Sequence, residues 1–411
     1  MSDWLKTNNW LFRSKLANAD DERRRFVLGV VVLIIAWLIQ AGLQYFGFFD
    51  RYDQADADQY AQTMPIPNEL SNHITIVEVD QDDYRTLFKS ESPLASNMVL
   101  ELVKAVQSYH PRVVGLDLLT ADWPDTLREG MVQNQPPIVW ARDANDANSN
   151  TSNQIARRDL VWNGVAGYST PPAGLCFAVP VNQPDSDGVV RSYLISVPAR
   201  EENASSSSNY PTMARVLASS YPDSELDCHT APPLEARRIR FTGEFHNFMN
   251  LHASDVLNDA NKSRQLGKYL SGRVVIVGGT FAEARDRYAS AGGYLNGVDI
   301  LAHSIESEIS GPLHELSVVT SLLLSLIFSF LAYWAVFRFR SPFDLGISAI
   351  LVLTYSFCLG WLAYRFLGVC APIGSSLFSL PIGVISEHFV MCPVRHRHLE
   401  LEQQADKLKQ K

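Results

Sequence analysis

The sequence predicts an α/β domain, built on a mixed or parallel sheet with flanking helices, together with four transmembrane α-helices. Long apolar blocks stand near both ends of the 411-residue chain, and the segment between them alternates short β-branched runs with segments of helical spacing. Charged residues make up only 19% of the chain, below the roughly 25% of an ordinary soluble domain. The net charge of −9 argues against nucleic acid as a partner, because proteins that bind it present a basic face.

The first apolar block, residues 26–49, has the length of about 20 residues that a membrane-spanning helix needs. Three arginines at residues 23–25 precede it, and acidic residues follow it from Asp50 onward. Positive residues stay on the cytoplasmic side of a membrane, so residues 1–25 are expected in the cytoplasm. A cleaved signal peptide is the alternative, but the block is too long for the apolar region of such a peptide.

Three further apolar blocks near the end of the chain are predicted as transmembrane helices, at residues 317–337, 345–367 and 369–391. Basic residues follow the first of them and begin the tail, residues 392–411, which places this tail in the cytoplasm with the N-terminus. The same topology places residues 50–316 outside the cytoplasm. The membrane is therefore an expected partner of this multi-pass chain.

Two ionisable residues, Glu387 and His388, stand inside the last apolar block. Ionisable groups within a membrane helix are candidates for a functional role. The pair is also close to the cytoplasmic end of the block, where side chains reach the interface without any such role. The sequence leaves both interpretations open.

The segment between the first and second blocks reads as one α/β domain. Strands are predicted at residues 74–80, 113–119, 137–141, 176–181, 189–197, 238–241 and 274–278. Helices are predicted at residues 94–109, 211–220, 254–257 and 297–309. The order strand, helix, strand over residues 74–119 predicts a parallel pair joined by a right-handed crossover.

Cys176 and Cys228 both lie in this expected extracytoplasmic segment. In an oxidising compartment they are able to form a disulfide across a long loop, which would stabilise the fold by about 2–4 kcal/mol. Two separate buried thiols are the alternative, and the sequence does not decide between them.

Several stretches of the domain match a known family in order. They are IVEVDQDDY (76–84), VVGLDLL (113–119), DSDGVVRSYLI (185–195), LSGRVVIVGGTFAEARDRY (270–288) and NGVDILAHSIESEISG (296–311). On these stretches the chain resembles the CHASE2 family of extracytoplasmic sensor domains, which usually have one membrane helix before the domain and about three after it. The chain departs from the family pattern at Leu301, where the family has histidine, and at Arg287-Tyr288, where Thr-Pro is usual.

The resemblance implies a sensory receptor in the inner membrane of a bacterium that detects a small ligand or an envelope partner. Relatives usually carry a kinase, a cyclase or a nucleotide-messenger domain after the last membrane helix, whereas this sequence has only the short tail there. We therefore expect the output to lie in a separate cytoplasmic or envelope protein. A homodimer is expected because the outer domain has to be coupled to the membrane helices.

Polar residues follow three of the predicted strands, at the edge where open α/β sheets bind ligands. Two are aspartates that end strands, and a Gly-Gly-Thr stretch supplies backbone amides able to hold an anion near a helix start. The candidate ligand site consists of Asp80, Asp117, Gly278, Gly279, Thr280 and Asp286. Alternatively, the aspartates cap loops and the glycines allow a tight turn.

Asp187, Gly188 and Arg191 belong to a stretch for which a structural role is expected. Asp-Gly supplies a turn into the following strand, and the arginine is available to pair with an acidic neighbour.

No catalytic motif is present: the sequence contains no phosphate-binding GxxxxGK[ST], no HExxH and no G-x-S-x-G. We therefore expect no cofactor, no metal and no enzyme, with an extracytoplasmic enzyme anchored by its helices as a minor alternative. A non-catalytic envelope scaffold remains the main alternative to a receptor, and would present exposed apolar patches in place of a polar site.

Overall fold

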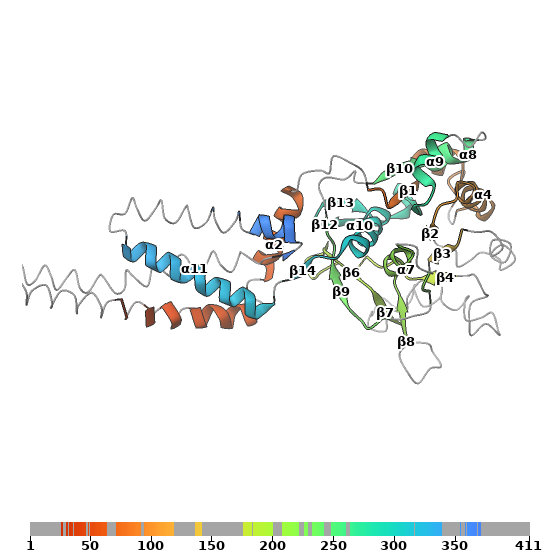
Figure 1. The fold of residues 1–411 in the computed structure, drawn as a ribbon. Helices are drawn as coiled ribbons and strands as arrows, with labels where there is room; N and C mark the ends of the chain where they lie inside the picture. Colours follow the sequence, from red (N-terminus) through yellow and green to blue (C-terminus); the bar gives the residue numbers. More distant parts are fainter. Residues whose placement is uncertain are drawn as a thin grey trace, which may run out of the picture. The chain divides into compact units, whose positions relative to one another are not determined.

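A computed structural model shows the architecture of the chain (Figure 1). The structure describes residues 26–63, 71–118, 136–141, 176–199, 208–221, 226–228, 232–241, 248–259, 264–315, 317–338 and 354–370, apart from 28, 29, 32, 36, 47, 49, 92, 93, 183, 355–357, 359 and 368. The chain divides into two compact units. One is Asp58–His314, and the other consists of Met1–Ala57 and Glu315–Lys411.

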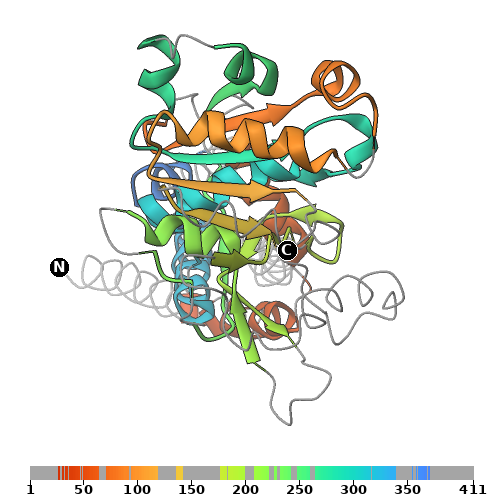
Figure 2. The same ribbon diagram turned by 90° about the vertical axis from the view of Figure 1, so that its right-hand side faces the viewer.

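A six-stranded parallel sheet forms the centre of the Asp58–His314 unit, with the strand order β10-β1-β11-β2-β3-β4. The strands are β1 (Ile74–Val79), β2 (Val113–Asp117), β3 (Ile138–Ala141), β4 (Cys176–Ala178), β10 (Met249–His252) and β11 (Val274–Gly279). All carboxyl ends therefore lie along one edge of the sheet. Figure 2 shows the strands side by side.

The central strands are apolar because helices cover both faces of the sheet, as is usual for parallel sheets. Every residue of β11 (VVIVGG) is buried, and β1 (ITIVEV) is buried apart from the half-buried Glu78. Glu78 is thus the one charged residue of β1.

One face of the sheet packs against α4 (Ser96–Gln107), α8 (Ala253–Asn258) and the end of α9 (Arg264–Leu270). The other face packs against α7 (Met213–Ser219) and α10 (Gly297–Ser310). Two glycines allow this second contact to be close, since an added Cβ at Gly115 or at Gly278 would meet Leu217 of α7 or Val298 of α10. Figures 1 and 2 show these two layers of helices.

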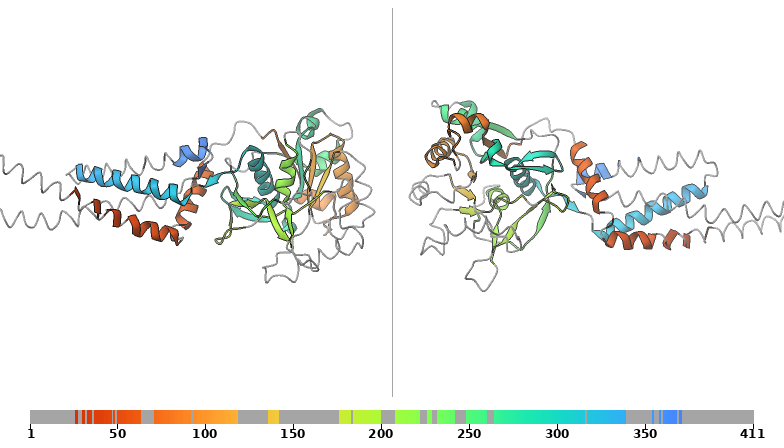
Figure 3. Two further views of the ribbon diagram at one scale, coloured as in Figure 1. Left: turned by 60° about the horizontal axis from the view of Figure 1, so that its bottom comes forward. Right: turned by 180° about the vertical axis from the view of Figure 1, so that it is seen from behind.

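Smaller sheets complete this unit. A three-stranded sheet joins β13 (Gly293–Asn296), β12 (Arg287–Ser290) and β5 (Val189–Val190). Two antiparallel pairs consist of β6 (Ser192–Leu194) with β9 (Ala236–Arg238) and β7 (Ser196–Ala199) with β8 (Ser208–Pro211). The β7–β8 pair is yellow-green in Figure 3. Short helical turns α3 (Gln81–Thr86) and η1 (Ala282–Ala284) follow β1 and β11.

The second unit contains α11 (Val318–Arg338), a π-helical turn η2 (Ala363–Leu367) and the short strand β15 (Val369–Cys370). The indole Nε1 of Trp37 donates to the Leu322 carbonyl oxygen at 3.1 Å. The Gln44 amide donates to Ser321 Oγ, also at 3.1 Å. The helix α2 (Asp50–Thr63) and the strand β14 (His314–Glu315) contain the boundaries between the units.

The prediction of four transmembrane helices is wrong for the part of the chain that the structure describes. A spanning helix needs about 20 consecutive apolar residues, and no helix among the described residues is long and apolar enough to cross a membrane. The predicted spans at residues 345–367 and 369–391 lie largely outside the described residues, and residues 1–25 and 392–411 lie wholly outside them.

The predicted strands and helices of the middle segment are mostly present, but their arrangement differs at one point. β1 and β2 are parallel, as predicted, yet they are not neighbours because β11 lies between them and pairs with both. The predicted strand over residues 189–197 is divided into β5, β6 and β7, which belong to three different sheets. The strands β10, β12 and β13 were not predicted.

Candidate functional site

The strand register places two carboxylates on either side of Gly278. This glycine of β11 is the register partner of Glu78 in β1 and of Asp117 in β2. Residues at one level of a parallel sheet project to the same face, here the face that α10 covers. An added Cβ at Gly278 would lie 2.8 Å from Cγ2 of Val298, in the first turn of α10. Glu78 and Asp117 therefore flank the start of this helix.

A third carboxylate, that of Asp286, lies directly against the first residue of α10. A Cβ added at Gly297 would overlap the Asp286 carboxylate, so only glycine fits there. The Gly297 amide donates to the Asp286 carbonyl oxygen at 2.8 Å, and the Tyr288 side chain hydrogen-bonds the carboxylate. The start of this 14-residue helix carries the positive end of its dipole, which stabilises nearby anions.

Burial shifts the acidity of these groups strongly. Burial raises the pKa of Asp117 to about 7, and the neighbouring charge of Asp286 raises it further in the same direction. Burial also raises the pKa of Asp286, against the opposing effects of Tyr288 and the Gly297 amide. The pKa of Tyr288 is raised to about 12 by burial and by Asp286. The Asp117 carboxyl therefore changes its charge near neutral pH.

Asp80 belongs to a neighbouring group at the ends of β1 and β10. Its Oδ1 accepts a hydrogen bond of 2.7 Å from the Asp83 amide and so caps α3. Its Oδ2 lies 3.1 Å from Nδ1 of His252, and the same nitrogen lies 3.7 Å from Oε1 of Glu78. Glu78 thus stands between Asp80 on one side and the first turn of α10 on the other.

The Gly278-Gly279-Thr280 stretch serves close packing in the structure. The Thr280 amide donates to the Val79 carbonyl oxygen at 3.0 Å, and its Oγ1 donates to Oε2 of Glu78 at 3.3 Å. An added Cβ at Gly279 would lie 2.6 Å from the Phe281 ring. Neither glycine has a positive φ, so the close approach of Val298 and Phe281 explains the glycines, and a tight turn does not.

Arg191 joins the Asp-Gly turn to α2. Its guanidinium donates to Asp185 at 3.0 Å, to Asp187 at 2.8 and 2.9 Å, and to both oxygens of Asp58 at 2.7 and 2.8 Å. Gly188 has φ +85°, as the turn requires, and hydrogen bonds from Arg191 lower the pKa of Asp187 to about 2. The Arg191 guanidinium is buried, and Asp58 is a partner that the sequence did not identify, while the structural role of this stretch stays a prediction.

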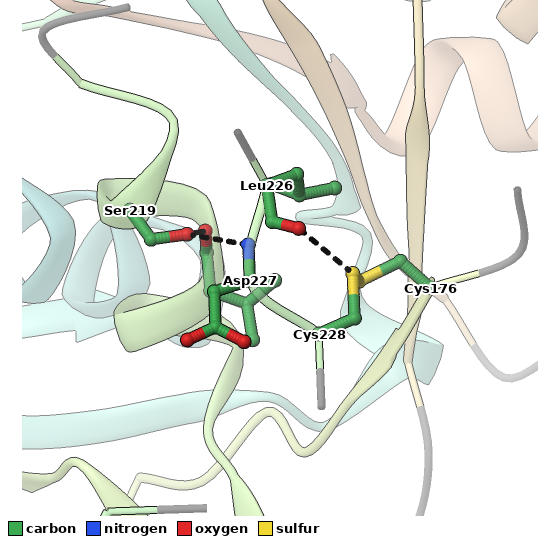
Figure 4. The surroundings of a disulfide bond; sticks show 6 residues. Cys176, Ser219, Leu226, Asp227 and Cys228 are labelled. Atoms are coloured by element: carbon green, nitrogen blue, oxygen red, sulfur yellow. Dashed lines mark hydrogen bonds between the residues drawn. A yellow bond between two sulfur atoms is a disulfide. The ribbon is translucent and has the colours of Figure 1, made fainter. Parts of the chain in front are cut away.

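Cys176 and Cys228 form a disulfide with a Cα–Cα distance of 5.4 Å. Figure 4 shows this bond beside Ser219, whose Oγ accepts a hydrogen bond of 3.2 Å from the Asp227 amide. The disulfide thus ties the edge strand β4 to the segment that follows α7. Disulfides persist in oxidising compartments, in agreement with an extracytoplasmic domain.

Sequence reasoning missed several residues that the structure brings to this edge of the sheet. They are Glu78, Asp83, His252, Tyr288 and Asp299. Glu78 was detectable, because it is the only charge within an apolar strand. His252 was not, since the strand β10 (MNLH) has no apolar run to predict it. The candidates Glu387 and His388 lie outside the described residues.

The site thus combines a parallel α/β sheet, half-buried carboxylates at the carboxyl edge of that sheet and a disulfide at its edge strand β4. The model of the CHASE2 domain family matches residues 29–336, and the chain belongs to this family. CHASE2 domains are extracellular sensory domains and are in general not enzymes. No curated protein and no solved structure matches the chain.

Proposed function

We propose that this chain is a sensory protein that detects an extracytoplasmic signal at the start of α10 and passes the response to a separate output protein. Family membership supports the sensory role. The disulfide between Cys176 and Cys228 supports an oxidising location for the domain Asp58–His314.

The observation that carries the proposal is the pair Asp117 and Asp286, half-buried together against the first turn of α10. A structural carboxylate is usually paired with a cation or with several donors. Asp117 instead has a second carboxylate as its neighbour, and its pKa near 7 lets a small change in its surroundings change its charge. A ligand that brings a positive charge or hydrogen-bond donors to this pair would stabilise both carboxylates in their ionised form.

Ligand screening with the purified chain tests this site. Unfolding temperatures at pH 7 would be measured with a panel of amino acids, polyamines and sugars, for wild type, Asp117→Asn and Glu101→Gln. Glu101 is exposed in the middle of α4, so its variant controls for the loss of one negative charge. A compound that stabilises wild type and the control, but not Asp117→Asn, supports the site. A compound that stabilises all three equally places the ligand elsewhere.

The output partner is tested by co-purification in mild detergent from native cells, followed by mass spectrometry. We expect a stoichiometric cytoplasmic kinase, cyclase or regulator. Envelope or assembly proteins alone would favour a non-catalytic scaffold instead. Cross-linking in native cells tests the proposed homodimer, and a result with monomers only would contradict it.

A further inference from the structure

We propose that Asp80, Asp83 and His252 form a binding site for one divalent transition-metal ion, with Zn²⁺ as the best-fitting example. One ligand atom from each of these residues lies within 4.8 Å of the other two. The three residues come from different elements, since Asp80 follows β1, Asp83 lies in α3 and His252 ends β10. The site is separate from the Asp117–Asp286 pair, so either proposal can fail alone.

The spacing of the donor atoms fits a small cation. Nδ1 of His252 and Oδ2 of Asp80 are 3.1 Å apart. Two ligands bound to zinc at about 2.0–2.1 Å in tetrahedral geometry are separated by about 3.3 Å. A metal ion therefore fits between these two atoms, and an Asp83 carboxylate oxygen, within 4.8 Å of both, would move toward the ion to complete the site.

Asp83 supplies an independent argument, because its carboxylate is buried without a charge partner. The residue is only 3% exposed, and the hydrogen bond that its side chain accepts, from the Ser254 amide, is long at 3.4 Å. Among the described residues no cationic side chain lies within ion-pair distance of it. Buried charges in proteins are normally paired or coordinate metals. A cation bound by Asp80 and His252 would compensate the negative charge of the Asp83 carboxylate.

The ligand set indicates the class of metal. An imidazole favours zinc and its neighbours in the first transition series, whereas calcium and magnesium prefer oxygen ligands alone. The His252 side chain is half exposed and that of Asp80 is 30% exposed, so the ion can enter from solvent and keep an open position for water or another ligand. Oε1 of Glu78 lies 3.7 Å from Nδ1 of His252, so a further carboxylate stands close to the proposed ion.

The test uses the full chain after treatment with a chelator. Zn²⁺, Mn²⁺ and Ca²⁺ would each be titrated calorimetrically into wild type, His252→Ala, Asp83→Asn and the control His314→Ala, which removes an exposed histidine. Bound metal would be counted by elemental analysis. We expect one Zn²⁺ per wild-type and per control chain, and an affinity at least about tenfold lower in His252→Ala.

His252 is exposed, so its variant is expected to fold, and circular dichroism without metal would verify this even if Asp83→Asn unfolds. Equal Zn²⁺ affinity of wild type and His252→Ala would overturn the proposal. No saturable Zn²⁺ binding to wild type would overturn it as well, and tighter binding of Ca²⁺ than of Zn²⁺ would refute the assigned class of metal. None of these results depends on a signal or on Asp117.

Discussion

Replacing Asp117 by asparagine is expected to make the protein more stable at neutral pH. The pKa of this carboxyl is about 7 in the folded chain, against about 3.9 in an unfolded one. The folded state therefore holds the proton more tightly, and stability falls as the pH rises from about 4 to about 7. This difference in pKa corresponds to a loss of at most about 4 kcal/mol in the free energy of unfolding. Because Asp117 is partly exposed to solvent, we expect a loss of about 2–4 kcal/mol.

Asparagine has nearly the shape of the protonated carboxyl and does not titrate. Urea unfolding would be measured at several values between pH 4 and pH 8 for wild type, Asp117→Asn and the control Glu101→Gln. The variant should match wild type near pH 4 and exceed its free energy of unfolding by about 2–4 kcal/mol at pH 8. Burial also raises the pKa values of Glu78 and Asp286, so a smaller decline with pH should persist in the variant.

Parallel pH profiles of wild type and Asp117→Asn would refute the argument, because the Asp117 carboxyl would then titrate alike in both states. A variant that is less stable than wild type at pH 8 would show that the ionised carboxylate has a stabilising partner.

Three further predictions concern the framework around the site. Arg191→Gln leaves three carboxylates without their common cation and should lower the free energy of unfolding by about 3–5 kcal/mol. Adding Asp58→Asn to this variant should restore part of the lost stability. If Arg191→Gln destabilises the protein no more than the exposed Arg85→Gln does, the cluster does not stabilise the fold. Replacing Cys176 and Cys228 by serine should lower stability by about 4 kcal/mol for a separation of 52 residues, and a reductant should destabilise wild type but not this variant. Gly278→Ala should lower the free energy of unfolding by about 1–3 kcal/mol, because the new methyl group overpacks against Val298. The loss should be smaller in a Val298→Ala background, where there is more room. Equal losses in the two backgrounds would argue against the contact.

Local sequence signals predicted much of the sheet, because its central strands are apolar on both faces. The runs that form β1, β2 and β11 have this composition, and the glycine and aspartate residues at their ends pointed to the sheet edge where we propose the ligand site. The insertion of β11 between β1 and β2 was not predictable, since no local pattern records which strands become neighbours. That neighbour relation is what sets Glu78 and Asp117 on either side of Gly278.

Other errors have equally specific causes. The β12–β13 hairpin contains no apolar run, so the partner that it brings to Asp286, Tyr288, was not foreseen. The sequence predicts an acidic neighbour for Arg191 but does not identify Asp58, which lies 133 residues earlier in the chain. In the sequence, Asp58 belongs to the acidic stretch that follows the first predicted membrane helix. Apolar composition was also insufficient to predict spanning helices, which the described residues do not contain.

The helix α10 begins beside the carboxylates and ends four residues before the last residue of its domain. With 14 residues it is about 21 Å long. Near its last turn, Glu308 binds Tyr193, Arg215 and Arg237, at oxygen–oxygen and oxygen–nitrogen distances of 2.6–2.9 Å. The helix ends at Ser310, and the domain itself ends at His314. If the proposed site is correct, a proton or ligand taken up at the first turn of α10 would act on a helix whose last residue is four residues from the end of the domain.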